Sequence, residues 1–236
     1  MLRLNSFLAL ALAGLLLLPA CEEVNDLLGV SDQEIVAGLK EALEVGTENS
    51  SDTLGRTDGY FRNELVKILL PPEAQAAEAR IRNLPIADGI LDDLVLEMNR
   101  AAEEAAKDVT PIFVDAITEM TIQDGMNILQ GDSTAATTYL RQQTYTELRE
   151  PYRPKIQSAM ESVGASQTWN TIAVNYNAGA AVVPGTEPLP EDISRYVTEE
   201  ALDGLFLIIG QEEQKIREDP AARGTDLLER VFAIQD

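Results

Sequence analysis

Apolar residues at helical spacing constrain this chain more than any other pattern. Between about Asp88 and Asp108, apolar side chains recur three and four residues apart, with charged side chains elsewhere: Leu91, Leu94, Met98, Ala102 and Ala105. This spacing places them on one face of an α-helix, and that face must be buried against another element. Similar spacing occurs from Ser31 to about residue 48 and from Ile193 to Arg217. The pattern predicts amphipathic helices packed against one another.

Only one stretch has the character of a β-strand. Residues 65–70 read Leu-Val-Lys-Ile-Leu-Leu, and Pro71 and Pro72 end the run. One extended segment cannot form a sheet without a partner strand. We therefore predict an all-α fold, a single multi-helix bundle of about eight to ten helices with no sheet.

Short polar motifs mark helix starts. A hydroxyl residue followed three positions later by an acidic residue can form a capping box, and two such pairs stand at expected helix starts: Ser31 with Glu34, and Thr121 with Asp124. Thr225 is expected to cap the last helix, and Pro72 suits the first turn of a helix reaching about Asn83.

One helix boundary depends on proline. Asp132 or Ser133 is expected to cap a long helix that ends at Pro151, and a second helical segment then continues to Gly164. The stretch from 178 to 190, rich in Gly, Ala and Pro, is the one long loop that we expect.

The charge balance argues against some partners. The chain has 236 residues, with 40 Asp and Glu against 18 Lys and Arg, and a formal net charge of −22. Such a charge repels nucleic-acid phosphates and anionic lipid head groups, so we expect no nucleic-acid partner. Solubility alone explains the acidity, and a basic partner or divalent cations are the sharper interpretation.

Histidine is absent, and Cys21 is the single cysteine. These absences exclude Ser-His-Asp and Cys-His nucleophilic catalysis, histidine-based zinc sites and internal disulfides. The sequence implies no cofactor.

The N-terminus predicts an exported, lipid-anchored protein. Residues 1–20 combine Arg3, an apolar run of about a dozen residues and small residues before Cys21, as a secretory signal peptide does; the run is too short to span a bilayer. Leu-Pro-Ala-Cys at 18–21 resembles the lipobox of bacterial lipoproteins, which implies that acyl chains on Cys21 anchor the mature chain to a membrane.

The resemblance to lipoproteins also implies an address. Lipoproteins without Asp after the acylated Cys usually reach the outer membrane of Gram-negative bacteria, and here that position is Glu22. We expect the inner leaflet of the outer membrane, facing the periplasm. The organisation is then a signal peptide at 1–20, a flexible tether at 21–30 and one all-helical domain at 31–236.

Several local motifs together resemble one family of exported bacterial proteins, which is known only as domain of unknown function 4197. The motifs lie at Met98–Glu103, Phe113–Ile117, Ile128–Gly131, Ala135–Thr137 and Ala201–Phe206. The resemblance extends from Ser31 to Phe232. It implies an all-helical envelope protein and supplies no activity.

Carboxylates form the best candidate site: Glu103, Asp115, Glu119 and Asp124. Carboxylates that face one another from two helices can bind Ca²⁺ or Mg²⁺ or serve acid–base catalysis. The Glu-x-x-His pairs of di-iron bundles and the EF-hand loop are both missing. Solvated helix faces, with Asp124 as a helix cap, are the simpler interpretation.

Three other polar residues need partners. Asn99 lies beside the apolar stripe, where an amide either hydrogen-bonds inside the core or binds a partner, and we favour the internal bond. Arg141 and Arg217 are expected to pair with carboxylates, and Glu213 lies at the right helical spacing for Arg217.

We therefore predict an outer-membrane lipoprotein whose periplasmic domain is a binding or scaffolding module, and we favour this over an enzyme. Its partners are the membrane, through acyl chains on Cys21, and a protein of the envelope. The candidate binding surface is Asn99, Glu103, Asp115, Glu119 and Arg141. The alternatives are a carboxylate-based metal-dependent hydrolase and a carrier of lipids or other apolar ligands.

Overall fold

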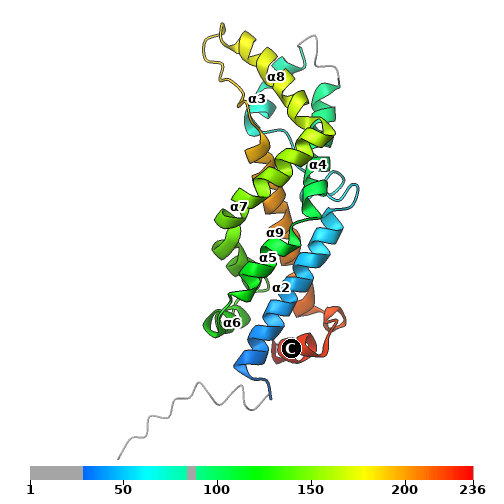
Figure 1. Ribbon diagram of the computed structural model, residues 1–236, viewed down its shortest axis with the longest axis vertical. Helices are drawn as coiled ribbons and strands as arrows, with labels where there is room; N and C mark the ends of the chain where they lie inside the picture. Colours follow the sequence, from blue (N-terminus) through cyan, green and yellow to red (C-terminus); the bar gives the residue numbers. More distant parts are fainter. Residues whose placement is uncertain (1–28, 84–88, 236) are drawn as a thin grey trace, which may run out of the picture.

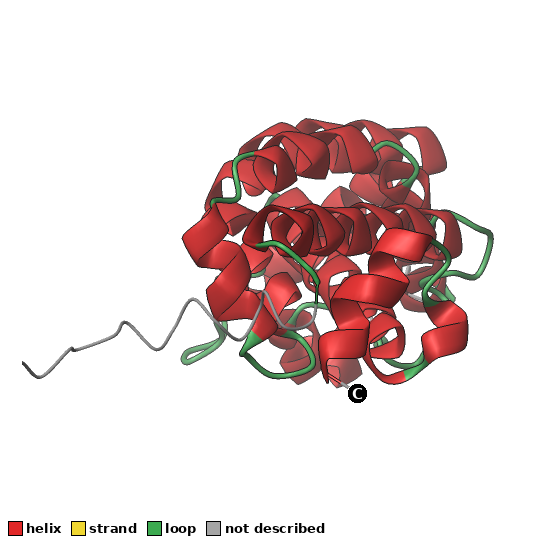
Figure 2. Cartoon of the chain, turned by 90° about the horizontal axis from the view of Figure 1, so that it is seen from below, coloured by secondary structure: helices red, strands yellow, loops and turns green. Residues whose placement is uncertain are grey.

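The computed structural model describes residues 29–83 and 89–235, so the predicted signal peptide, Cys21 and most of the tether lie outside the described residues. The described residues form nine α-helices, two 3₁₀ helices and no β-strand (Figures 1 and 2), which confirms the predicted all-α fold. The elements are α2 (Asp32–Leu54), α3 (Pro72–Ile81), α4 (Ile90–Ala106), α5 (Thr110–Thr118), α6 (Ile122–Leu129), α7 (Ala135–Val163), α8 (Ala165–Ala180), α9 (Ser194–Glu218), η1 (Pro220–Ala222), α10 (Asp226–Phe232) and η2 (Ala233–Gln235).

Helix α9 is the centre of the bundle. It packs against α7 on one side and α2 on another, and α4 also contacts it. Its residues 204–206 and 208–210 are buried in consecutive runs. A helix with one buried stripe would not bury adjacent residues in this way, so α9 is covered from more than one side. The other long helices are arranged around it along the length of an elongated molecule (Figure 1).

Close approach between packed segments depends on glycine, as two positions illustrate. A Cβ added to Gly125 of α6 would lie 2.5 Å from Cγ2 of Val36 in α2, and one added to Gly204 of α9 would lie 3.1 Å from Cβ of Val66. Both distances are shorter than ordinary van der Waals contact. Glycine therefore sets how closely α6 approaches α2 and how closely the 65–70 segment approaches α9.

The predicted N-terminal caps at Ser31, Thr121 and Thr225 are present in the structure. Both capping boxes are present, with Glu34 and Asp124 each accepting a backbone N–H while the hydroxyl three residues earlier accepts another. Thr225 accepts the backbone N–H of Leu228 at the start of α10. Helix α2 is longer than expected and ends at Leu54, because its buried face continues past residue 48 to that residue.

The predicted helix break at Pro151 is wrong. The helix is continuous from Ala135 to Val163 and contains both Pro151 and Pro154. Each proline deprives the carbonyl four residues earlier of a donor, and those carbonyls belong to exposed residues, Glu147 and Glu150, where water can replace the bond. Buried residues such as Tyr152 and Ile156 hold this part of the helix against the core. Tertiary packing thus overrides the local signal.

The predicted cap of α7 is also wrong. Neither Asp132 nor Ser133 caps the helix, and Thr134 occupies the cap position without a side-chain hydrogen bond to the helix. Asp132 instead accepts hydrogen bonds from the N–H and hydroxyl of Thr134. The first N–H groups of α7 instead donate to a carboxylate of α9, which is described below.

Residues 65–70 form no strand. Their side chains alternate as in a strand, with Val66, Ile68 and Leu70 buried and Leu65 and Leu69 exposed. No second strand pairs with them among the described residues.

No helix in the described part of the chain is both long enough and apolar enough to cross a membrane.

Candidate functional site

Asn99 holds the strand-like segment in place. Its side chain is fully buried; Oδ1 accepts the Ile68 N–H at 2.9 Å, and Nδ2 donates to the Ile68 carbonyl at 2.7 Å. Nδ2 also donates to the carbonyl of Val95 at 2.7 Å. A primary amide carries the same donor and acceptor as a peptide group, so Asn99 supplies the pairing that a neighbouring strand would supply. The expected internal hydrogen bond is present.

Glu103, one helical turn further along α4, binds the backbone of residues 60 and 61, which come before α3 in the chain. Its Oε1 accepts the backbone N–H groups of Tyr60 and Phe61 at 3.2 and 3.1 Å, and its Oε2 pairs with Arg100 at 2.6 Å. Arg100 also pairs with Asp58 at 2.7 Å. Asn99 and Glu103 therefore dock residues 58–70 onto α4, and both are buried inside the domain.

Asp115 and Glu119 lie elsewhere, in an acidic cleft of about 430 Å³ between α5, α6 and α7. Asp124 and Glu147 also line this cleft, and no Lys or Arg does. Asp115 and Glu119 are exposed, and neither has a side-chain hydrogen bond or ion pair within the described ranges. The cleft is therefore a concave surface with uncompensated negative charge.

Asp124 is committed to local structure. The hydroxyl and N–H of Thr121 and the hydroxyl of Tyr139 donate to its Oδ2, at 2.6, 3.0 and 3.0 Å. The Thr121 hydrogen bonds hold the pKa of Asp124 below its ordinary value. Burial, followed by the hydrogen bond to Asp124, raises the pKa of Tyr139 to about 12. Asp124 thus remains an anion that caps α6, and Tyr139 remains protonated at neutral pH.

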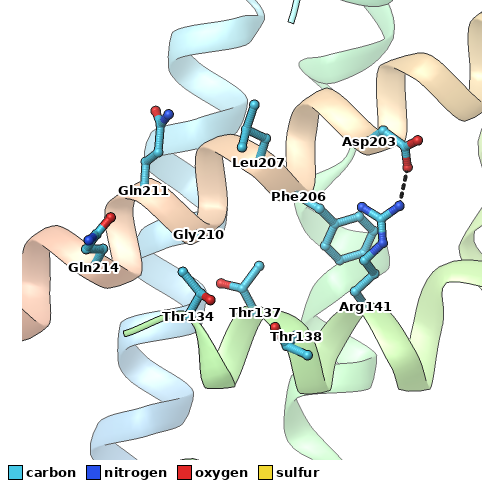
Figure 3. Close-up of a pocket in the computed structure, with 10 residues that line it drawn as sticks. All are labelled: Thr134, Thr137, Thr138, Arg141, Asp203, Phe206, Leu207, Gly210, Gln211 and Gln214. Carbon is cyan, nitrogen blue, oxygen red and sulfur yellow. Dashed lines mark hydrogen bonds and ion pairs between the residues drawn. The ribbon is translucent and has the colours of Figure 1, made fainter. Parts of the chain in front are cut away.

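Arg141 lies on the other side of α7, in an open groove of about 600 Å³ between α7 and α9 (Figure 3). Its guanidinium pairs with Asp203 at 2.5 Å and lies over the rings of Tyr145 and Phe206, at 4.8 and 5.4 Å from their centroids. Burial, followed by the charge of Asp203, raises the pKa of Tyr145 to about 12. The predicted carboxylate partner is present, and the cation is oriented by two aromatic rings.

The rest of the groove is uncharged. Gly210 of α9 lies in the floor of the groove and has no side chain to fill it. A Cβ added to Gly210 would lie 3.6 and 3.7 Å from the methyl groups of Thr134 and Thr137. Thr138 and Gln211 also line it, and no side-chain hydrogen bond engages them among the described residues. The groove thus offers hydroxyl and amide groups beside an aromatic surface.

The hollows form a continuous series around the N-terminal half of α7. A third hollow, of about 260 Å³, shares Thr138 with the groove and shares Asp124 and Tyr139 with the acidic cleft. Gln142 is exposed and lines this third hollow. The first half of α7 is therefore a ridge with concave surfaces on both sides.

The five residues singled out from the sequence do not converge. Asn99 and Glu103 are internal, Asp115 and Glu119 share the acidic cleft, and Arg141 lies in the α7–α9 groove. The described part of the chain includes no group of three or more Asp, Glu, His or Cys side chains that could hold a metal ion.

Glu213 has a role that the sequence does not indicate. This buried carboxylate of α9 accepts the backbone N–H groups of Ala136 and Thr137 at 2.9 and 2.7 Å, and the Thr137 hydroxyl at 2.7 Å. It also pairs with Arg217, itself buried, at 2.9 Å. Glu213 therefore caps α7 from a separate helix. The spacing of Glu213 and Arg217 was visible in the sequence, but their burial was not.

The chain belongs to a family. The sequence profile described as "Protein of unknown function (DUF4197)" matches residues 29–233, nearly the whole described domain. Comparisons with curated proteins and with solved structures found no match.

Proposed function

We propose that this member of the DUF4197 family is a lipid-anchored binding module of the bacterial outer membrane, which holds a protein partner of the envelope on the ridge formed by the first half of α7. The single observation that carries the proposal is the series of hollows on both sides of that ridge. The signal-like residues 1–20 and Cys21, which is the residue that would carry the acyl chains, support the anchoring part of the proposal.

The shape of the surface favours a protein partner over a small ligand. The three hollows are open and lie side by side, whereas small-molecule sites are usually single cavities that enclose most of the ligand. A protein that straddles α7 would reach the groove and the acidic cleft together. The groove offers Phe206 and Leu207 as apolar contacts, and its threonine and glutamine groups can hydrogen-bond to a polypeptide.

The charges favour a partner with basic side chains. Asp115 and Glu119 have no cation beside them in the cleft, so a Lys or Arg from the partner would find carboxylates that need no existing ion pair to be broken. The net charge of −22 would also speed the approach of a basic surface.

Most of the other buried polar groups are committed to the fold. Asn99, Glu103 and Glu213 each bind backbone groups of this chain. A hydrolase would require groups that converge on one reacting atom. The carboxylates of the acidic cleft are divided between the cap of α6 and exposed positions, which supports binding over catalysis.

The test of the ridge is site-specific photocrosslinking in intact cells. A photoreactive residue replaces Gln142 on the ridge, and a matched control replaces Glu44, which is exposed on α2. We expect a discrete adduct with an envelope protein from position 142 and none from position 44. Asp115→Lys with Glu119→Lys should weaken that adduct because it reverses the charge of the cleft. Equal adducts from both positions, or none from position 142, would contradict the proposal.

The test of the anchor is separate. Cys21→Ser should release the chain from the membrane fraction and abolish labelling by a radioactive fatty acid. Lipid anchoring would be contradicted if Cys21→Ser left the amount of protein in the membrane fraction unchanged and the parent chain carried no acyl label. That result would leave the proposal for the ridge intact.

A further inference from the structure

Helix α8 and the residues that follow it as far as Thr186 carry no charged side chain. Residues 162–186 contain no Asp, Glu, Lys or Arg, in a chain whose formal net charge is −22. These residues lie at the end of the elongated molecule that is opposite the start of α2 and the C-terminus (Figure 1). An uncharged helix therefore lies at one end of a strongly acidic domain, beside charged residues of α3 such as Arg80, which hydrogen-bonds to Thr186.

The inner face of α8 is occupied by the core. Trp169, Ile172 and Tyr176 are buried, and the indole N–H of Trp169 donates to the Pro190 carbonyl at 2.8 Å. Asn177 pairs with both backbone groups of Leu189 at 2.8 and 3.0 Å, in the same way as Asn99 pairs with Ile68. These contacts fix the orientation of α8 and of the chain that follows it.

The outer face of α8 has no partner among the described residues. Gln167, Asn170, Val174 and Ala178 recur three and four residues apart and are exposed, with Val174 59% exposed. Val182 and Val183 continue beyond the helix and are 80% and 50% exposed. Residues at this spacing form one stripe, which combines amide groups with an apolar centre.

The charge distribution favours a second copy of this chain as the partner of the outer face of α8. Two copies of a chain with a net charge of −22 repel each other across most faces. The outer face of α8 is a place where two copies can approach without opposing carboxylates. A basic partner, in contrast, would gain no ion pair there and would be attracted to the acidic cleft.

We propose that the outer face of α8, formed by Gln167, Asn170, Val174 and Ala178, packs against the same face of a second copy of this chain around a two-fold axis. In such a symmetric contact, the amides of Gln167 and Asn170, in the first half of the stripe, can hydrogen-bond to the second copy, and the two Val174 side chains meet near the centre. The inference goes beyond the proposed binding role, because it concerns another face and another partner.

The contact is expected to be weak. Helix α8 has 16 residues, so its face is about 24 Å long and about 10 Å wide, or about 240 Å², which is less than the roughly 800 Å² per partner of a standard interface. Dimers should therefore form mainly at high local concentration, for example when copies share one membrane surface. Added salt should strengthen the association, since it screens repulsion between the two acidic bodies. Binding of a basic partner would weaken with salt instead.

Disulfide trapping tests the geometry. Val174→Cys is introduced into the full chain and compared in intact cells with Leu65→Cys, a control at a similarly exposed apolar residue, and with the parent chain, whose only cysteine is Cys21. Under mild oxidation we expect roughly tenfold more dimer linked through position 174 than through position 65, with the linked cysteines identified by mass spectrometry. Equal trapping at both positions, or a link from 174 to a different protein, would overturn the proposal.

A charge-swap experiment distinguishes loss of contact from loss of folding. Val174→Glu and Val174→Lys should each lower the self-association constant of the purified full chain about fivefold, because like charges about 4 Å apart repel even in water. A mixture of the two variants should regain association, measured by sedimentation equilibrium, with helicity checked by circular dichroism. A mixture that associates no better than either variant alone would refute the symmetric contact.

Discussion

The buried pair of Glu213 and Arg217 offers the sharpest test of how this domain is held together. We predict that Glu213→Gln destabilises the domain by about 3 to 5 kcal/mol. The substitution keeps the size of the side chain but removes its charge and replaces one acceptor oxygen with an NH₂ group. The change thus affects both the start of α7 and the ion pair with Arg217.

The magnitude follows from the contacts. Oε2 of Glu213 accepts the N–H and the hydroxyl of Thr137, while Oε1 accepts the N–H of Ala136 and pairs with Arg217. An amide cannot accept at both positions, so a buried backbone N–H loses its acceptor at a cost of about 1 to 3 kcal/mol. Arg217 keeps its contact with the Ile128 carbonyl but loses the neighbouring negative charge. Removing one partner of a buried pair costs about 3 to 5 kcal/mol in comparable cases.

Urea denaturation followed by the fluorescence of Trp169 measures the change. Trp169 is the single tryptophan and is buried, so its emission should report unfolding. Glu104→Gln is the matched control, because Glu104 pairs with Lys107 on the surface, where both side chains are more than half exposed. An exposed pair of this kind contributes less than about 1 kcal/mol. If the two substitutions had similar effects, the cap supplied by Glu213 would not be a major source of stability.

Three further predictions concern single contacts, and each is measured by the same denaturation assay. Asn99→Ala leaves both backbone groups of Ile68 without their partner inside the core and should cost about 2 to 4 kcal/mol; a loss below about 1 kcal/mol would mean that water replaces the amide. Gly125→Ala places a methyl group against Val36 and should cost about 1 to 3 kcal/mol, part of which Val36→Ala in the same chain should restore. The Asp124 carboxylate has a pKa below its ordinary 3.8, so its stabilising effect is present above that pH and is lost as the pH falls through the lower, folded value. Asp124→Asn should therefore cost up to about 0.5 kcal/mol at pH 7 and less in acid, and a cost that does not change with pH would contradict this role.

Features of the fold that depend on neighbouring residues could be predicted from the sequence. The capping boxes at Ser31 and Thr121 involve side chains only three residues away, and both form as expected. The apolar stripe of α4 likewise depends only on helical periodicity. Local hydrogen bonds and helical spacing therefore account for the correct assignment of an all-α fold.

Features that depend on distant residues could not be predicted. The start of α7 depends on Glu213, 76 residues away from Thr137, and nothing next to Thr134 indicates it. Pro151 is tolerated because packing of the same helix further along holds it in place and because the freed carbonyls lie at exposed residues. The strand-like run around Ile68 finds its hydrogen-bonding partner in the side chain of Asn99.

The candidate site shows the same limit in another form. The segment from Asn99 to Arg141 is continuous in sequence, but it spans four helices that present their polar residues in different directions. Asn99 and Glu103 point into the domain because α4 must hold residues 58–70, whereas Asp115 and Arg141 face opposite sides of α7. The hollows around α7 combine this segment with α9, which lies more than 60 residues later in sequence than Arg141 at the point of contact with Asp203. A binding surface assembled in this way requires the packing of α7 on α9 before it exists. For that reason, loss of the Glu213 cap should weaken crosslinking from Gln142 even though Glu213 itself is buried beneath the ridge.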